Sequence, residues 1–193
     1  MRIIGGTARG TRLQSLPVAT LRPMLDRVKE SLFNILREDI AGSRVLDLFS
    51  GSGALGLEAL SRGAASCVFV ENDSRLAALV MENARRCKLA DRCELMQASV
   101  LELPRYRPMV GGVPADIALA GPPYVMVDDP NKRAELFKAL EDLCGLWIRP
   151  GALVVVHHRP MPYAVWPTSC LRQTDQRIYG RSQLTFFEMQ ARS

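Results

Sequence analysis

Apolar positions along the chain alternate between a spacing typical of buried strands and a spacing typical of amphipathic helices. Short apolar runs predict five strands, at 44–49, 67–71, 93–97, 116–120 and 152–157. Helical spacing predicts amphipathic helices at about 24–38, 54–62, 74–88 and 132–147. Such an alternation of strands and helices predicts a mostly parallel sheet that is covered by helices on both faces.

The two ends of the chain depart from that pattern. Residues 1–16 mix short apolar stretches with Gly and Thr, as a small β-hairpin or an extended arm does. Stretches near 170–178 and 183–189 flank a glycine and predict an antiparallel hairpin. We therefore expect an α/β fold with a doubly wound, mostly parallel, seven-stranded sheet that ends in this hairpin. A basic arm over 1–22 precedes one globular unit over 23–193.

Composition narrows the class of protein. The length of 193 residues and the 48% hydrophobic content suit one globular domain. The sequence has no apolar run of the roughly 20 residues that a membrane span needs, and no signal-peptide pattern at its start. Its five cysteines are odd in number and lack any CxxC spacing. We expect a cytoplasmic monomer without a metal, a disulfide framework or a membrane anchor.

Positive charge is concentrated near the N-terminus. Residues 1–37 hold seven basic and two acidic side chains, whereas the rest of the chain has 18 of each. A basic arm on a neutral body is typical of a protein that binds a polyanion, and a solvated basic surface is the alternative. The arginines that we expect to contact phosphates are Arg9, Arg12, Arg22 and Arg27.

A glycine-rich loop follows the first predicted strand. Gly51-Ser52-Gly53-Ala54-Leu55-Gly56 matches G-x-G-x-x-G and opens a predicted helix. Glycines there allow a tight turn and a close approach of backbone N–H groups to a ligand. Glu71 ends the next strand, where a carboxylate can accept hydrogen bonds from ribose hydroxyls. The combination predicts a nucleotide-type ligand, with a simple packing turn as the alternative.

An acid in the strand before the loop indicates which class of ligand the loop binds. Asp47 lies four residues before Gly51 and interrupts an otherwise apolar strand. A carboxylate at that point repels a pyrophosphate but suits the ammonium group of a methionine-derived cofactor. A dehydrogenase is therefore disfavoured. The stretch Val45-Leu46-Asp47-Leu48-Phe49-Ser50-Gly51-Ser52-Gly53 resembles the first motif of S-adenosylmethionine-dependent methyltransferases.

A second motif follows the fourth predicted strand. Gly121-Pro122-Pro123-Tyr124 is similar to the Asp/Asn-Pro-Pro-aromatic motif of methyltransferases that modify amines of nucleic acid bases. The lone pair of such an amine is delocalised into the ring, so the site must accept its N–H hydrogens to aim it at the methyl group. The prolines fix the loop, and the aromatic ring stacks on an extruded base.

Longer stretches extend the resemblance along essentially the whole chain. They are Arg2-Ile3-Ile4-Gly5-Gly6, Arg9-Gly10, Leu21-Arg22-Pro23, the helix over 26–36, and Gly53-Ala54-Leu55-Gly56-Leu57-Glu58-Ala59-Leu60-Ser61-Arg62-Gly63-Ala64. Together they closely resemble the bacterial 16S ribosomal RNA guanine-N2 methyltransferases. The resemblance implies S-adenosylmethionine as methyl donor and a guanine of 16S rRNA, free or in a small-subunit particle, as substrate.

The same resemblance implies the site residues. Those expected to bind the cofactor are Asp47, Phe49, Ser50, Gly51, Ser52, Gly53, Glu71, Asn72, Ala98 and Ser99. Those expected at the reacting amine are Gly121, Pro122, Pro123 and Tyr124.

Three positions depart from the family pattern. Gly121 stands where the family has Asp, so a side-chain acceptor for the amine is missing. In the third-strand region Gln97-Ala98-Ser99 displaces the polar group expected to meet the adenine, which leaves Gln97 or Ser99 to substitute. Met24 replaces the Thr that usually follows Arg-Pro.

The loss of a positioned proton acceptor typically costs about 10²–10⁴-fold in rate. Our hypothesis is therefore either impaired catalysis or a relocated acceptor. Asp128 and Asp129 are the nearest candidates, although solvated loop acids are the preferred interpretation. His157-His158 is interpreted as strand-end packing.

Two other functions stay open at this point. One is methylation of another nucleic acid amine, such as adenine N6 in DNA. The other is a non-catalytic RNA-binding or ribosome-assembly protein on the same fold, which Gly121 and Ala98 favour.

Overall fold

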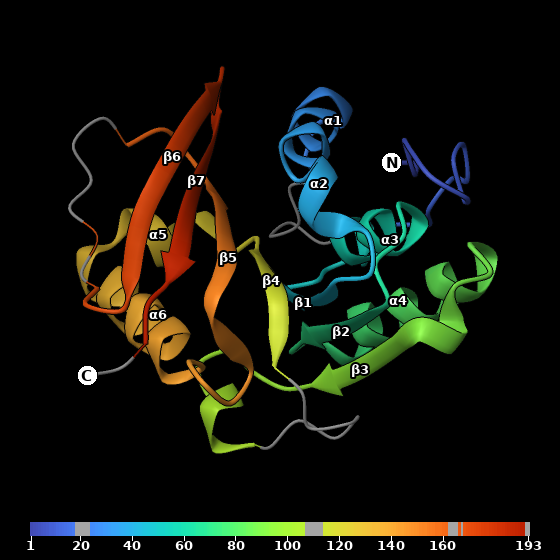
Figure 1. Ribbon diagram of the computed structural model, residues 1–193. Helices are drawn as coiled ribbons and strands as arrows, with labels where there is room; N and C mark the ends of the chain where they lie inside the picture. Colours follow the sequence, from blue (N-terminus) through green and yellow to red (C-terminus); the bar gives the residue numbers. More distant parts are fainter. Residues whose placement is uncertain (18–23, 107–113, 162–165, 167, 192–193) are drawn as a thin grey trace.

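A single mixed sheet forms the centre of the computed structural model, which describes residues 1–17, 24–106, 114–161, 166 and 168–191 (Figure 1). The strands in the described residues lie in the order β3-β2-β1-β4-β5-β7-β6. Their bounds are β1 Arg44–Leu48, β2 Ser66–Glu71, β3 Cys93–Gln97, β4 Ala115–Ala120, β5 Ile148–His158, β6 Leu171–Tyr179 and β7 Ser182–Met189. Strands β1 to β5 run parallel, and β7 is antiparallel to both β5 and β6. The predicted doubly wound sheet with a terminal antiparallel hairpin is confirmed.

Helices cover both faces of this sheet. Their bounds are α1 Asp26–Ile35, α2 Arg37–Ile40, α3 Ala54–Ser61, α4 Ser74–Arg86, α5 Tyr124–Asp128 and α6 Pro130–Asp142. Helices α1 to α4 and the N-terminal arm pack into one apolar core, on the face that carries Val45, Ile117 and Val155. Helices α5 and α6 pack on the other face, against Leu46 and Val154. Alternate strand residues therefore face different helices, as the pleat requires.

Helix α6 is shorter than the sequence predicted. It begins at Pro130, because the Asp129 carboxylate caps it by accepting hydrogen bonds from the N–H groups of the next turn. It ends at Asp142 rather than 147. Trp147, expected on the helix face, lies beyond this end, where its buried indole N–H donates to the carbonyl of Tyr106.

Three further features of the helices and strands differ from the prediction. The helix expected over 24–38 is divided in two between Ile35 and Arg37. Strand β5 begins at Ile148, four residues early, and its pairing with β4 is irregular around Ala115. Helix α5 occupies a segment for which no helix was predicted.

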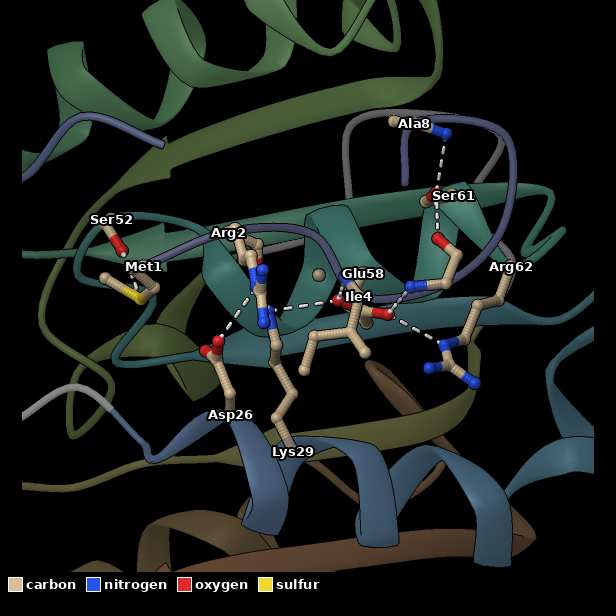
Figure 2. Close-up of polar contacts among 12 residues, drawn as sticks. Met1, Arg2, Ile4, Ala8, Asp26, Lys29, Ser52, Glu58, Ser61 and Arg62 are labelled. Atoms are coloured by element: carbon tan, nitrogen blue, oxygen red, sulfur yellow. Dashed lines mark hydrogen bonds and ion pairs between the residues drawn. The ribbon is translucent and has the colours of Figure 1, made fainter. Parts of the chain in front are cut away.

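The N-terminal arm lies along α3, where one buried carboxylate is a central partner of its backbone (Figure 2). A single antiparallel bridge, Arg2 with Arg12, closes the arm. Glu58 of α3 accepts the N–H groups of Ile4 and Gly5, each at 2.8 Å. The same carboxylate pairs with Lys29 of α1 at 3.0 Å and with Arg62 at 2.8 Å.

Four donors therefore converge on Glu58, whose side chain is 0% exposed. A buried carboxylate stays charged only when such partners replace water. Lys29 also donates to the carbonyl of Arg2 at 2.6 Å, so the arm, α1 and α3 share one polar network.

Close backbone packing completes the attachment of the arm. Gly6 has a φ of +74°, and a Cβ on it would lie 1.7 Å from the carbonyl oxygen of Ser61. Gly10 has a similar φ of +87°, but a Cβ there meets nothing within 4 Å. A side chain at Gly10 would therefore incur only the energetic cost of a left-handed backbone, whereas a side chain at Gly6 would also incur the cost of a steric clash.

Gly6→Ala is expected to lower the free energy of unfolding by about 2–4 kcal/mol, and Gly10→Ala by only about 1 kcal/mol. Urea denaturation measures both values. Because the clash lifts the arm from α3, trypsin should also cut after Arg9 or Arg12 faster in the Gly6 variant. Equal effects of the two substitutions would contradict this account of the arm.

Candidate functional site

A cavity of about 690 Å³ opens at the carboxyl edge of the parallel strands. This edge, where the strand order reverses between β1 and β4, is where doubly wound sheets bind ligands. The cavity is lined on one side by the predicted residues Asp47, Phe49, Ser50, Gly51, Ser52, Glu71, Asn72, Ala98 and Ser99. On the other side it is lined by Gly121, Pro122, Pro123 and Tyr124.

The glycine loop owes its shape to left-handed backbone at several residues. Gly51 and Gly53 have φ values of +58° and +78°, and Phe49 adopts +60° although it is not a glycine. A bulky residue in that region indicates local strain, which is commonly stored at functional sites. The Ser50 hydroxyl closes the turn by donating to the carbonyl of Asp47 at 2.7 Å.

Two of the motif glycines serve packing. Gly53 does not line the cavity; it precedes α3, and a Cβ on it would lie 3.2 Å from the side chain of Val80. A Cβ on Gly56 would lie 2.4 Å from the ring of Phe69. The first glycine therefore shapes the loop, and the later ones let α3 and its neighbours pack closely.

Glu71 lies across the loop at the end of β2. One of its carboxylate oxygens accepts the N–H of Gly51 at 2.8 Å, and the other accepts the N–H of Asp73 at 2.9 Å. These bonds hold a half-buried carboxylate at the wall of the cavity. A carboxylate oxygen has more than one acceptor position, so both can also accept from a ligand hydroxyl.

Asp47 is buried behind the same loop. Its side chain accepts the N–H of Gly56 at 2.9 Å, and the residue is 1% exposed. Burial raises the pKa of Asp47 to about 8, and the nearby negative charge of Glu71 adds to this effect. A cationic ligand group beside Asp47 would reverse the shift, because it stabilises the charged carboxylate.

The Pro-Pro-Tyr loop joins β4 to α5. The N–H of Gly121 donates to the carbonyl of Leu48, and Pro123 precedes the first turn of α5. The Arg159 guanidinium lies 4.6 Å from the centre of the Tyr124 ring and forms an ion pair with Asp128 at 3.4 Å. The loop thus presents an aromatic ring with a cation above it, next to the cofactor side of the cavity.

The candidates for a relocated acceptor do not line the cavity. Asp129 caps α6, and Asp128 pairs with Arg159, so both are structural or solvated acids as the sequence interpretation preferred. Gln97 is exposed outside the cavity, whereas Ser99 lines it.

The predicted phosphate-binding arginines do not line the cavity either. Arg9, Arg12 and Arg27 are exposed on the surface, and Arg22 lies outside the described residues. Arg27 lies near the β6–β7 turn, because a Cβ on Gly180 would be 3.6 Å from its guanidinium.

Several cavity residues were not predicted from the sequence. Met1, Ser15 and Leu16 of the arm line it, as does Arg159 beyond the end of β5. Asn83 of α4 is fully buried and bonds both to Gln14 of the arm and to the carbonyl of Ser52. No motif marks these residues, because the arm reaches the cavity only through tertiary packing.

The two histidines at the end of β5 differ from one another. His158 uses both ring nitrogens, one with the carbonyl of Arg159 at 2.6 Å and one with the hydroxyl of Thr185 at 2.8 Å. His157 lines the cavity, and its buried Nε2 has no hydrogen-bond partner among the described residues. Packing explains His158, as predicted, but it leaves His157 unexplained.

The strand order, the crossovers and the glycine loop at this edge define a class I S-adenosylmethionine-dependent methyltransferase. The chain belongs to the family described as Conserved hypothetical protein 95, whose sequence profile matches residues 1–188. The predicted enzyme class and cofactor are confirmed, and a dehydrogenase is excluded.

Individual relatives agree with this assignment. The chain is 38% identical over 161 residues to ribosomal RNA small subunit methyltransferase D of Escherichia coli K12, covering 81% of this chain and 73% of the relative. The protein of that name from Haemophilus influenzae is 37% identical over 161 residues, covering 81% and 77%. The solved structure of yhhF from Escherichia coli matches with a TM-score of 0.82 and 30% identity, covering 100% and 99%.

The described residues contain neither a helix that could span a membrane nor a cluster of side chains that could hold a metal ion. Among the described helices, none combines the length and apolarity needed to cross a membrane. Within the same residues, no group of three or more His, Cys, Asp or Glu side chains is arranged to hold a metal ion.

Asp47→Asn is expected to stabilise the cofactor-free protein by about 1–3 kcal/mol at pH 8. The raised pKa means that folding favours the protonated acid, so the natural chain loses stability as the pH rises towards about 8. The gap between variant and natural chain should widen from pH 5 to 8 and then stay constant, as urea denaturation measures.

Asp116→Asn is the matched control. Hydrogen bonds from Arg44, and then from Arg149, lower the pKa of Asp116, so its carboxylate stabilises the fold and the contribution is lost as the pH falls. Its variant should therefore be the less stable one at neutral pH. If the difference in unfolding free energy between Asp47→Asn and the natural chain did not change with pH, burial would not raise the pKa of Asp47 as described.

Proposed function

We propose that the chain transfers a methyl group from S-adenosylmethionine to the exocyclic N2 amine of a guanine in 16S ribosomal RNA. The observation that carries this proposal is that the glycine loop, Glu71 and the Pro-Pro-Tyr loop line the same cavity. The names of the Escherichia coli and Haemophilus influenzae relatives support ribosomal RNA as the substrate. We further propose that it acts in the cytoplasm as a monomer.

The chain's residues fit the methyl donor. The Glu71 carboxylate would accept hydrogen bonds from ribose hydroxyls, and a ligand ammonium group beside Asp47, behind the loop, would restore the charge of that acid. Phe49, Ser50, Gly51, Ser52, Asn72, Ala98 and Ser99 complete this side of the cavity. When bound there, the donor supplies an electrophilic methyl group carried by a sulfonium.

The other side of the cavity suits a base taken out of the RNA stack. Tyr124 provides a flat surface for it, and Arg159 above the ring can stack on a base or pair with a phosphate. The loop prolines fix the backbone, so the carbonyl groups near Gly121 can accept one amine hydrogen in a constant position.

The exposed arm supplies the charge that a polyanion needs. Arg9 and Arg12 lie on a segment that is anchored to α3 and itself lines the cavity through Met1, Ser15 and Leu16. Arg9 and Arg12 would hold RNA phosphates on the arm, which itself reaches the cofactor side of the cavity.

Purified protein is expected to convert guanosine to N2-methylguanosine in small-subunit rRNA that lacks the modification. Tyr124→Ala should lower kcat/KM by about 10- to 100-fold, since base stacking contributes about 1–3 kcal/mol, while Tyr124→Phe stays close to the natural rate. Mass spectrometry of the methylated nucleosides measures both. N6-methyladenosine as the product would sink the guanine assignment.

The double variant Arg9→Ala, Arg12→Ala should weaken RNA binding and lower the slope of log affinity against log salt by about 0.7–0.9 for each phosphate that the arm no longer neutralises. Lys138→Ala is the control, because Lys138 is exposed on α6, on the other face of the sheet, and pairs with Asp142. An equal salt slope for all three proteins would exclude the arm as a phosphate-binding segment.

A further inference from the structure

Gly121 directly follows the last residue of β4, beside the part of β5 that holds His157. The register pairs Ala120, that last residue, with Val156, so Gly121 and His157 each come one residue after this pair. Ala120 and Val156 face the core on the α5 and α6 side. Because side chains alternate, positions 121 and 157 both face the opposite side, the side that Asp47 also faces.

The space between these two positions is open. A Cβ placed on Gly121 would meet no atom within 4 Å, and both residues line the cavity. Neighbouring strands of a sheet lie about 4.7–4.9 Å apart. An imidazole at position 157 therefore reaches the region into which a side chain at 121 would extend.

The chemistry of His157 suits a hydrogen-bond acceptor. The residue is 8% exposed, its Nε2 has no partner among the described residues, and its ring meets that of Tyr124 edge-on at 6.5 Å. Burial, with a smaller effect of His158, lowers the pKa of His157 to about 4. The ring is therefore neutral at pH 7, and one of its nitrogens carries a lone pair that can accept a hydrogen bond.

A buried nitrogen without a partner is costly, so a ligand group that donates a hydrogen bond to it is favoured there. Two residues beside the loop cannot act as side-chain acceptors. Gly121 has no side chain, and the Arg159 guanidinium can only donate hydrogen bonds.

We propose that His157 supplies the side-chain acceptor that the Gly121-Pro122-Pro123-Tyr124 loop lacks. Its imidazole accepts an N–H of the target amine while the base stacks on Tyr124. This inference rests on the proposed transfer of a methyl group to a base amine.

The proposed step balances in atoms and charge. A bond forms between the amine nitrogen and the methyl carbon, and the bond from that carbon to sulfur breaks, with its electron pair left on sulfur as a neutral thioether. The nitrogen, which becomes cationic, loses one proton to the imidazole. The imidazolium, with its low pKa, then returns the proton to water.

A double-mutant cycle between positions 121 and 157 tests the proposal. His157→Ala is expected to lower the methylation rate by about 10²–10⁴-fold at saturating cofactor, with cofactor affinity changed less than about threefold. In the His157→Ala background, Gly121→Asp should raise the methylation rate at least tenfold. In the natural background the same substitution should not raise the rate by tenfold or more, because His157 already supplies an acceptor there.

Rescue by a second acceptor separates this function from a structural one. His158→Ala is the matched control: it removes a buried hydrogen-bonded ring and should lower thermal stability, and Gly121→Asp should not rescue its activity. His157→Gln, whose amide oxygen is an acceptor, should keep more activity than His157→Ala.

A measurement independent of turnover uses long-range ¹H–¹⁵N spectra of the imidazoles. Adding an rRNA fragment together with S-adenosylhomocysteine should shift a His157 ring nitrogen towards the values of a hydrogen-bonded acceptor, while those of His158 stay constant.

Three results would overturn the inference. An unchanged rate in His157→Ala would remove it and leave the proposed function intact. A gain of tenfold or more from Gly121→Asp in the natural chain would mean that no acceptor is present. If natural chain and variants alike bind cofactor but methylate no rRNA base, the inference and the proposed function fail together.

Discussion

The buried carboxylate of Glu58 accepts hydrogen bonds and ion pairs from four donors, and these contacts join the elements on the cofactor side of the molecule. Lys29 comes from α1, Arg62 from the end of α3, and two backbone N–H groups from the arm. Removal of Lys29 or Arg62 would take away one of the two cations that balance a carboxylate which water does not reach. Because Lys29 and the arm also line the cavity, the same ion cluster that joins the elements fixes one wall of the binding site.

Much of the fold and of the cofactor side follows from local sequence. Strand–helix alternation, the glycine loop, Asp47 and Glu71 are close in the chain and carry strong periodic or motif signals. The missed features depend on long-range packing: α5 has no periodicity of its own over its five residues, and Trp147 is buried by tertiary contact beyond the helix it was assigned to. The arm's docking on α3 also has no local signal, since its partner Glu58 looks like an ordinary helix residue in the sequence.

Gly121 shows how the interpretation of a local departure depends on the neighbouring strand. On its own it indicates a lost group, and acids farther along the loop are the natural substitutes to consider. The register of β4 with β5 instead brings the histidine of a distant segment beside it. In the proposed mechanism two positions 36 residues apart in sequence act together, and strand pairing suggests this where motif comparison does not.

The arm also bears on how the protein folds. Its backbone partners lie far along the chain: Ile4 and Gly5 bond to Glu58, and Gln14 bonds to Asn83. During synthesis this first segment leaves the ribosome well before α4 exists, so it has no native surface to dock on. Contacts of such long sequence separation form late, because the entropy of loop closure opposes them until the intervening chain is ordered. The wall of the cavity is thus completed only after the central strands and helices have assembled, which makes binding competence a late event in folding.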